Sequence, residues 1–268
     1  MDPISRPAAF VMVSTGHGTM IVARNDYRMT EDGSGGYGVG FQLLNTSLFD
    51  ASEVDIVLQM LALRRAHFGD GVQALDCGAN IGVHTVEWAR LMTGWGTVVG
   101  IEAQERIFYA LAGNIAINNC LNARVLHAAV GGEEGVIEVP DLDYTSPGSF
   151  GSLEIKARPE GSEFMGQAVD YAAGPKTPVN LVTIDGLGFE RLDFIKLDVE
   201  GMEMEALRGG LETINQFKPQ MLVEVIKTAP GEVAAFLAEL GYRTFPMGIN
   251  LLAIHESDPG WENIQVNE

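Results

Sequence analysis

The residues best suited to chemistry in this sequence lie in a glycine-containing loop at residues 76–82 (DCGANIG). A short apolar run, 72–75, precedes the loop, and a stretch with helical spacing follows it through about Leu91. Glycine permits the tight turn that joins a strand to a helix, and such turns bind ligands at the carboxyl edge of a parallel sheet. The loop therefore predicts a cofactor site, and its neighbours must indicate which cofactor.

Three features of the surrounding residues narrow the choice of cofactor. The nicotinamide fingerprint has a glycine in the middle of the loop to admit a pyrophosphate, whereas Asn80 stands there. Asp76 would repel a pyrophosphate but can bind the α-ammonium of methionine, and Glu102, which ends the next apolar run, can accept two hydrogen bonds from a ribose diol. Small residues at 128–130 leave room for a flat adenine ring. We therefore predict S-adenosylmethionine as the cofactor, with S-adenosylhomocysteine as the product, and keep a nicotinamide or nucleotide-sugar enzyme as the alternative.

The motifs in this region resemble those of the FkbM-type methyltransferases. The loop at 76–82 resembles the D-x-G-A-N-x-G loop of that family, and residues 195–201 (IKLDVEG) resemble its K-x-D-x-E-G motif. Residues 222–225 (LVEV) and 182–185 (VTID) resemble the strands that follow and precede the second motif. The likeness covers roughly 72–226. It implies a class I S-adenosylmethionine fold and O-methylation of a hydroxyl on a sugar, glycan or natural-product small molecule.

The resemblance also implies roles for single residues. Asp76, Gly78, Asn80 and Glu102 would bind the cofactor, and Cys77 stands where the family more usually has valine or isoleucine, a small change because a buried cysteine is apolar. For His84, on the helix after the loop, a purely structural role is the alternative. The full set that we expect at the cofactor is Asp76, Cys77, Gly78, Ala79, Asn80, Gly82, His84, Glu102, Ala103, Ala129 and Asp198.

Three carboxylates near the ends of later apolar runs are candidates for catalysis. A hydroxyl acceptor needs a general base as the new bond forms, and we expect Asp198 to be that base, with Glu200 and Glu224 as the second and third candidates. Glu200 could instead stabilise the start of a helix through its dipole. The three carboxylates could also hold a divalent ion such as Mg²⁺, since hard oxygen ligands suit it, but no metal is predicted.

The elements that must position these residues alternate between strands and helices. Helix-length segments at about 104–119, 202–217 and 231–240 follow apolar runs, and the apolar runs lie at 72–76, 96–102, 123–130, 192–198 and 221–226. This alternation predicts a mostly parallel, seven-stranded Rossmann-like sheet with helices on both faces. Two final apolar runs, 242–245 and 250–254, predict a hairpin at the edge of that sheet.

Two segments fall outside the alternation. Residues 1–70 predict an N-terminal extension packed on the methyltransferase domain at 71–268, with a strand or hairpin near 17–23 and a helix capped by residues 50–53. Residues 131–180 are rich in Gly, Pro and Ser. Long loops inside compact domains are usually functional or disordered, so we predict a substrate-facing insertion there, with a solvated linker as the alternative.

Charge and motif content exclude some partners. Acidic residues outnumber basic ones by 36 to 17, for a formal net charge of −19, whereas nucleic-acid binding draws on Lys and Arg that neutralise phosphates. The sequence also lacks the proline–aromatic pair of nucleobase N-methylation and the Pro-Cys nucleophile of cytosine methylation. We therefore expect no nucleic-acid partner and a small-molecule or glycan substrate. A nitrogen or protein acceptor, and a cofactor-binding module without catalysis, stay as alternatives.

Cysteine content and hydropathy indicate the compartment. Cys77 and Cys120, the only cysteines, suit reduced thiols and cannot supply the three thiolates of a radical-type iron–sulfur cluster. No stretch reaches the ~20 apolar residues of a membrane helix, and the N-terminus does not have the pattern of a signal peptide. We expect a cytoplasmic protein without a membrane span, and the sequence leaves open whether it is a monomer or an oligomer such as a dimer.

Overall fold

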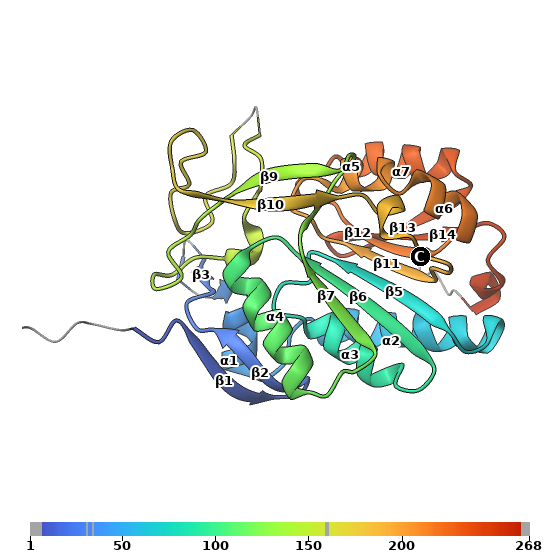
Figure 1. Cartoon of the computed structure of the whole chain (residues 1–268), viewed down its shortest axis with the longest axis horizontal. Coiled ribbons are helices and arrows are strands. Elements are labelled where there is room, and N and C mark those ends of the chain that lie inside the picture. Colours follow the sequence, from blue (N-terminus) through green and yellow to red (C-terminus); the bar gives the residue numbers. More distant parts are fainter. Residues whose placement is uncertain (1–6, 31, 34, 159–160, 264–268) are drawn as a thin grey trace, which may run out of the picture.

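The computed structural model describes residues 7–30, 32–33, 35–158 and 161–263. A seven-stranded sheet forms its centre, with the strand order β13-β14-β12-β11-β5-β6-β7 (Figure 1). All neighbouring pairs are parallel except those that involve β14, which is antiparallel to both β12 and β13. The strands are β5 (Val72–Cys77), β6 (Gly96–Glu102), β7 (Ala123–His127), β11 (Phe194–Leu197), β12 (Gln220–Glu224), β13 (Tyr242–Met247) and β14 (Asn250–His255). The predicted mostly parallel seven-stranded sheet and its edge hairpin are confirmed.

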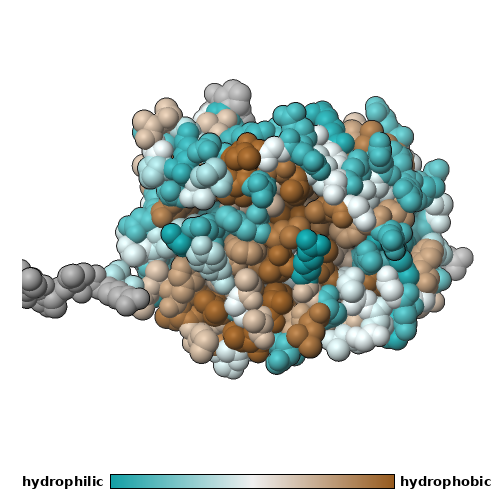
Figure 2. All heavy atoms as spheres, viewed as in Figure 1, coloured by the Kyte–Doolittle hydropathy of each residue, from teal (hydrophilic) through white to brown (hydrophobic). Residues whose placement is uncertain are grey.

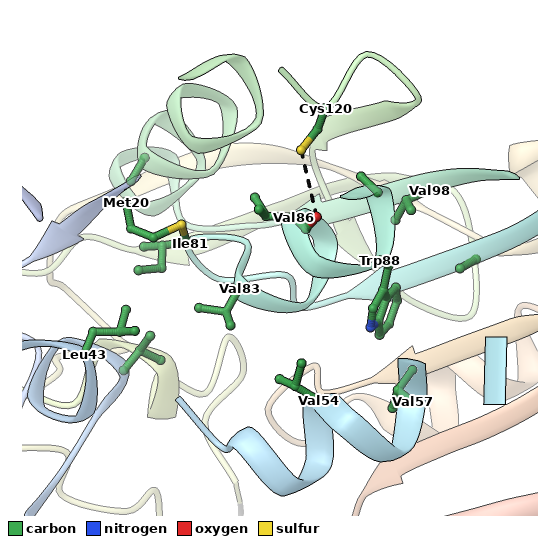
Figure 3. Close-up of a cluster of buried hydrophobic side chains, with 14 of the residues drawn as sticks. Met20, Leu43, Val54, Val57, Ile81, Val83, Val86, Trp88, Val98 and Cys120 are labelled. Atoms are coloured by element: carbon green, nitrogen blue, oxygen red, sulfur yellow. Dashed lines mark hydrogen bonds between the residues drawn. The ribbon is translucent and has the colours of Figure 1, made fainter. Parts of the chain in front are cut away.

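The helices cover both faces of the sheet, each over its own apolar core. One core packs α2 (Ala51–Phe68), α3 (Val83–Leu91) and α4 (Glu105–Ile117) on the sheet, and Figure 3 shows it around Trp88, Val86 and Val57. The other packs α5 (Glu203–Arg208), α6 (Leu211–Phe217) and α7 (Pro230–Glu239) on the opposite face. Every residue of β11 and β12 is buried, as strands covered on both faces require. Figure 2 shows further apolar residues near the centre of the face that presents α4 and β7.

Two predicted elements are broken in the structure. The run at 123–130 is not one strand, because β7 ends at His127 and β8 (Ala129–Val130) joins a different sheet. The helix predicted over 202–217 is divided into α5 and α6 at Gly209 and Gly210. A Cβ on Gly209 would lie 2.2 Å from the carbonyl oxygen of Gly131, so the close approach of this backbone requires glycine and interrupts the helix.

The N-terminal extension contains more structure than predicted. A hairpin of β1 (Phe10–Thr15) and β2 (Gly18–Ala23) packs on α4, where Asn114 exchanges hydrogen bonds with the backbone of Ile21. A second pair, β3 (Arg28–Met29) with β4 (Gly36–Tyr37), and helix α1 (Val39–Thr46) follow. Asp50 does precede α2, but its side chain accepts a hydrogen bond from Gln42 and does not cap the helix.

The insertion at 131–180 is not the long loop that its composition predicted. It holds β9 (Gly135–Pro140) and most of β10 (Lys176–Val182), which form a three-stranded sheet with β8, and a short 3-10 turn, η1 (Phe150–Ser152). The strand expected at 182–185 is also shorter, because β10 ends at Val182 and the turn η2 (Asp185–Leu187) follows.

The extension and the insertion meet at one buried carboxylate. The two oxygens of Asp26 accept hydrogen bonds from the backbone N–H groups of Gly40 (3.1 Å) and Phe150 (2.9 Å). Burial raises the pKa of Asp26 to about 6, although these backbone donors act to lower it. Figure 1 accordingly shows the two segments on the same side of the molecule.

The last element described is the turn η3 (Pro259–Asn263). Within the described ranges, no helix is long and apolar enough to cross a membrane.

Candidate active site

A cavity of about 340 Å³ lies beyond the carboxyl ends of β5, β6, β11 and β12. Its size falls in the range of small-molecule sites, and its position is where ligands bind in open parallel sheets. The structure brings into its wall all three candidate bases and most of the expected cofactor residues: Asp76, Gly78, Ala79, Asn80, His84, Glu102, Ala103, Ala129, Asp198, Glu200 and Glu224.

Two expected cofactor residues do not line the cavity. Cys77 is fully buried in the core beneath α5–α7, and burial raises the pKa of its thiol well above the usual range. Gly82 has a φ of 89°, and a Cβ there would lie 2.5 Å from Cδ1 of Leu111 on α4. Both residues therefore contribute to packing, and Gly82 lets α3 begin close to α4.

Gly78 joins the loop to the second motif. Its φ is 79°, and a Cβ would lie 1.7 Å from the carbonyl oxygen of Asp198. Glycine is thus required both for the turn and for the close contact between the two motifs. Asn80 continues the loop with a φ of 51°, a value that asparagine adopts more readily than most residues. The loop geometry therefore fixes the backbone position of Asp198.

Asp76 has one oxygen engaged and one that is available. Its Oδ2 accepts a hydrogen bond of 2.6 Å from the hydroxyl of Thr85 on α3. Its Oδ1 is buried and has no hydrogen-bond partner among the described residues. A buried carboxylate oxygen without a partner is costly, so this atom suits a cationic donor such as the α-ammonium of S-adenosylmethionine.

Glu102 is held by the backbone on both of its oxygens. The N–H of Asn80 donates to Oε2 at 2.9 Å, and the N–H of Gln104 donates to Oε1 at 2.8 Å. Each carboxylate oxygen keeps a second acceptor position, so the ribose diol expected at this residue can still be bound. Burial raises the pKa of Glu102 to about 7, with the charge of Asp198 adding to the rise and the two backbone donors opposing it.

The three candidate bases form one cluster. Asp198, Glu200 and Glu224 each offer one oxygen, and these oxygens lie within 4.8 Å of one another. Glu224 is 7% exposed, and its Oε2 has no hydrogen-bond partner in the described part of the chain. Burial, with the charge of Asp198, raises the pKa of Glu224 to about 8 and that of Glu200 well above its usual range. Mutual repulsion of this kind favours shared protons at neutral pH.

Two lysines, which the sequence did not single out as site residues, neutralise part of the cluster. Nζ of Lys196 donates to Oδ2 of Asp198 at 2.7 Å, and Lys227 contacts Glu200 and donates to the carbonyl oxygen of Ser152 at 2.8 Å. Burial alone would lower the pKa of Lys196, but the surrounding carboxylates raise it above its usual range. The sequence signal for Lys196 was its position inside the apolar run 192–198, since a lysine buried in a strand needs a paired negative charge nearby.

His84 and Glu53 bring α3 and α2 together at the cavity wall. Nε2 of His84 lies 3.1 Å from Oε1 of Glu53, and Glu53 also accepts a hydrogen bond from Asn250. The extension contributes further lining residues that the sequence did not assign, Tyr37, Phe49 and Asp50, while the insertion contributes Ser149, Gly151, Ser152 and Ile155. Glu200 does not start a helix; Glu203 instead accepts from the backbone N–H groups of Val199 and Gly201.

Comparison with known proteins shows which family this chain belongs to. The sequence model of the methyltransferase FkbM domain matches residues 76–244, which is more than half of the 268 residues. No curated protein matches.

Among solved structures, methyltransferase FkbM from Methylobacillus flagellatus KT is 18% identical with a TM-score of 0.49, and the match covers 69% of this chain and 44% of that one. A precorrin-6y C5,15-methyltransferase from Geobacter metallireducens GS-15 is 14% identical (TM-score 0.43, 78% and 89% covered). The tRNA (uracil-54, C5)-methyltransferase of Pyrococcus abyssi, in complex with S-adenosyl-L-homocysteine, is 12% identical (TM-score 0.43, 92% and 43% covered).

This chain spans less than half the length of the Methylobacillus protein. The family is assigned from the match between residues 76–244 and the sequence model of the FkbM domain. That match covers the glycine loop, Glu102 and the whole carboxylate cluster. The chain belongs to the FkbM methyltransferase family, and its mostly parallel seven-stranded sheet has a class I, Rossmann-like fold.

Proposed function

We propose that this enzyme transfers the methyl group of S-adenosylmethionine to a hydroxyl oxygen of a sugar, glycan or natural-product small molecule. The observation that carries the proposal is that the carboxylate cluster lies in the same cavity as Asp76 and Glu102. Asp76 would bind the methionine ammonium through its unpartnered oxygen, and Glu102 the ribose hydroxyls. The methyl donor would then lie between these anchors and the cluster.

Within the cluster, Asp198 is the proposed general base. Asp198 and Glu200 each pair with a lysine, and Asp198 is the more exposed of the two. The accessible fraction of its side chain is 29%, against 16% for that of Glu200. Lys196 binds only one of its oxygens, so the other can accept the acceptor hydroxyl's proton as the oxygen attacks the methyl carbon. The proton moves to Asp198, the new bond is O–CH₃, and the thioether of S-adenosylhomocysteine leaves with the electron pair of the broken S–CH₃ bond.

The remaining walls support a neutral, partly apolar acceptor. Tyr37 and Phe49 from the extension, with Ile226 and Ile249 from the loops after β12 and β13, line the outer part of the cavity. Aromatic and aliphatic walls suit the C–H faces of a sugar ring or a polyketide-like chain, and the acidic cluster disfavours an anionic acceptor. A nitrogen acceptor is the second candidate, because three carboxylates could also bind an ammonium group.

The test is transfer of labelled methyl from S-adenosylmethionine to panels of hydroxylated and aminated acceptors, with the product bond identified by mass spectrometry. We expect methyl ethers, and we expect Asp198→Asn to lower turnover by at least about 100-fold, as loss of a general base does, while S-adenosylhomocysteine affinity stays within about threefold. Glu239→Gln, an exposed acid on α7, is the matched control. N-methyl products, or unchanged turnover of Asp198→Asn, would contradict the proposal.

A further inference from the structure

The carboxylate cluster has a property that a general base does not require. A base needs one carboxylate, yet oxygens of Asp198, Glu200 and Glu224 lie within 4.8 Å of one another. One of them, Oε2 of Glu224, is buried and has no hydrogen-bond partner among the residues that the structure describes. A buried, unpartnered carboxylate oxygen destabilises the fold unless a ligand satisfies it.

We propose that these three carboxylates bind a divalent cation of the Mg²⁺ or Mn²⁺ class, which holds two neighbouring oxygens of the acceptor. Such ions prefer oxygen ligands and usually combine a few carboxylates with substrate oxygens and water. Octahedral bonds of about 2.1 Å place ligand oxygens roughly 3 to 4.2 Å apart, so oxygens at the 4.8 Å limit of the cluster must approach by about 0.6 to 1.8 Å. Rotation of the two glutamate side chains can supply that movement.

The two lysines fit this assignment. Lys196 occupies Oδ2 of Asp198, and Lys227 occupies Oε2 of Glu200. Each of these two acids therefore keeps a second oxygen for the cation, while the lysine holds its side chain in place, as partners behind metal ligands commonly do. A carboxylate oxygen has two acceptor positions, so the free oxygen of Asp198 can contact the cation through one and receive the proton of the acceptor hydroxyl through the other. Binding of the cation displaces the protons that these acids share at neutral pH. The three ionised acids and two lysines then sum to a charge of −1, and the bound ion makes the site positive where the acceptor oxygen becomes negative.

The cation site narrows the acceptor class. A chelated ion with open positions selects acceptors that carry two adjacent oxygens, such as vicinal diols, over isolated alcohols. This inference rests on the proposed function for its role in catalysis, but cation binding itself can be measured without turnover.

Titration of the protein with Mn²⁺, followed by electron paramagnetic resonance and in competition with Mg²⁺, tests the site. We expect one bound ion, and at least about tenfold weaker binding in Glu224→Gln and in Asp198→Asn. Glu239→Gln, which is exposed on α7, should bind as the unaltered protein does. Melting temperature and S-adenosylhomocysteine affinity, measured on each variant, separate loss of the ion from loss of the fold.

The absence of a bound ion, or equal binding in all variants, would overturn the proposal. Methyl transfer that a chelator leaves unchanged would overturn the role of the ion in holding the acceptor, while leaving the proposed O-methyl transfer intact. Failure to bind S-adenosylhomocysteine would instead count against the proposed function alone. Chelator-sensitive transfer that Mg²⁺ restores, with a preference for vicinal diols, is the expected result.

Discussion

Replacing Glu102 with glutamine should weaken cofactor binding and remove its dependence on pH. In the unaltered protein both oxygens accept backbone N–H groups, from Asn80 and Gln104, and they have acceptor positions left for the ribose. Glutamine presents one NH₂ group, which must face one of these backbone donors. Losing the charged acceptor of the ribose hydroxyls costs about 1–3 kcal/mol, which is roughly 5- to 150-fold in affinity. The backbone N–H left without an acceptor lowers the stability of the fold instead.

The pH dependence follows from the raised pKa of about 7 at Glu102. The carboxylate binds the ribose hydroxyls when ionised, so affinity is present above the folded-state pKa and is lost as pH falls through it. If the ionised form alone binds, about nine-tenths of the protein is competent near pH 8 and about one-tenth near pH 6, which gives a tenfold difference. Glu102→Gln has no such proton and should show a flat profile.

Isothermal titration with S-adenosylhomocysteine at these two pH values measures both effects. Repeating each titration in buffers of different ionisation enthalpy shows whether protons are exchanged on binding. The reasoning is refuted if the unaltered protein binds equally well at both pH values, or if Glu102→Gln retains the same slope as the unaltered protein.

Three further substitutions probe other contacts. Asp76→Asn removes the charge that we propose binds the ammonium. S-adenosylhomocysteine affinity by calorimetry should then fall about 10- to 100-fold, and an unchanged Kd would remove Asp76 from the site. Gly78→Ala places a Cβ against the carbonyl of Asp198, so urea unfolding should show a loss of more than about 2 kcal/mol, and full stability would contradict the contact. Asp26→Asn sets an NH₂ group against a backbone donor of Gly40 or Phe150, which costs about 1–3 kcal/mol of stability. Limited proteolysis should then cut the insertion faster. Equal cutting rates would show that Asp26 does not hold the insertion on the extension.

The central sheet could be predicted from the sequence because its strands are continuous apolar runs between helical segments. The insertion could not, because β10 carries Pro178 and β9 ends at Pro140, residues that usually mark strand edges or loops. These two strands pair mainly with each other, and the end of β10 also pairs with β8, which lies in a different sheet from β7 because the chain changes sheets at Ala128. That change is a tertiary event without a local signal.

Most of the candidate site could likewise be predicted, since strand ends meet at one edge of a parallel sheet. Cys77 and Gly82 do not line the cavity, because neighbours in a loop can point into the core, and their contact with the cofactor stays a prediction. Lys196 was missed because its burial depends on carboxylates from three different elements, Asp198, Asp76 and Glu53. Sequence spacing places Asp198 beside Lys196 but does not show that Asp76 and Glu53, which are distant in the chain, lie near it.

A crystal structure with S-adenosylhomocysteine is the most direct measurement of the central claim, which is that one cavity holds the methyl donor against the carboxylate cluster. We predict the methionine ammonium within hydrogen-bond distance of Oδ1 of Asp76, the ribose hydroxyls on Glu102, and the sulfur facing Asp198. A cofactor bound with its ribose away from Glu102, or with its sulfur turned from the cluster, would contradict the account.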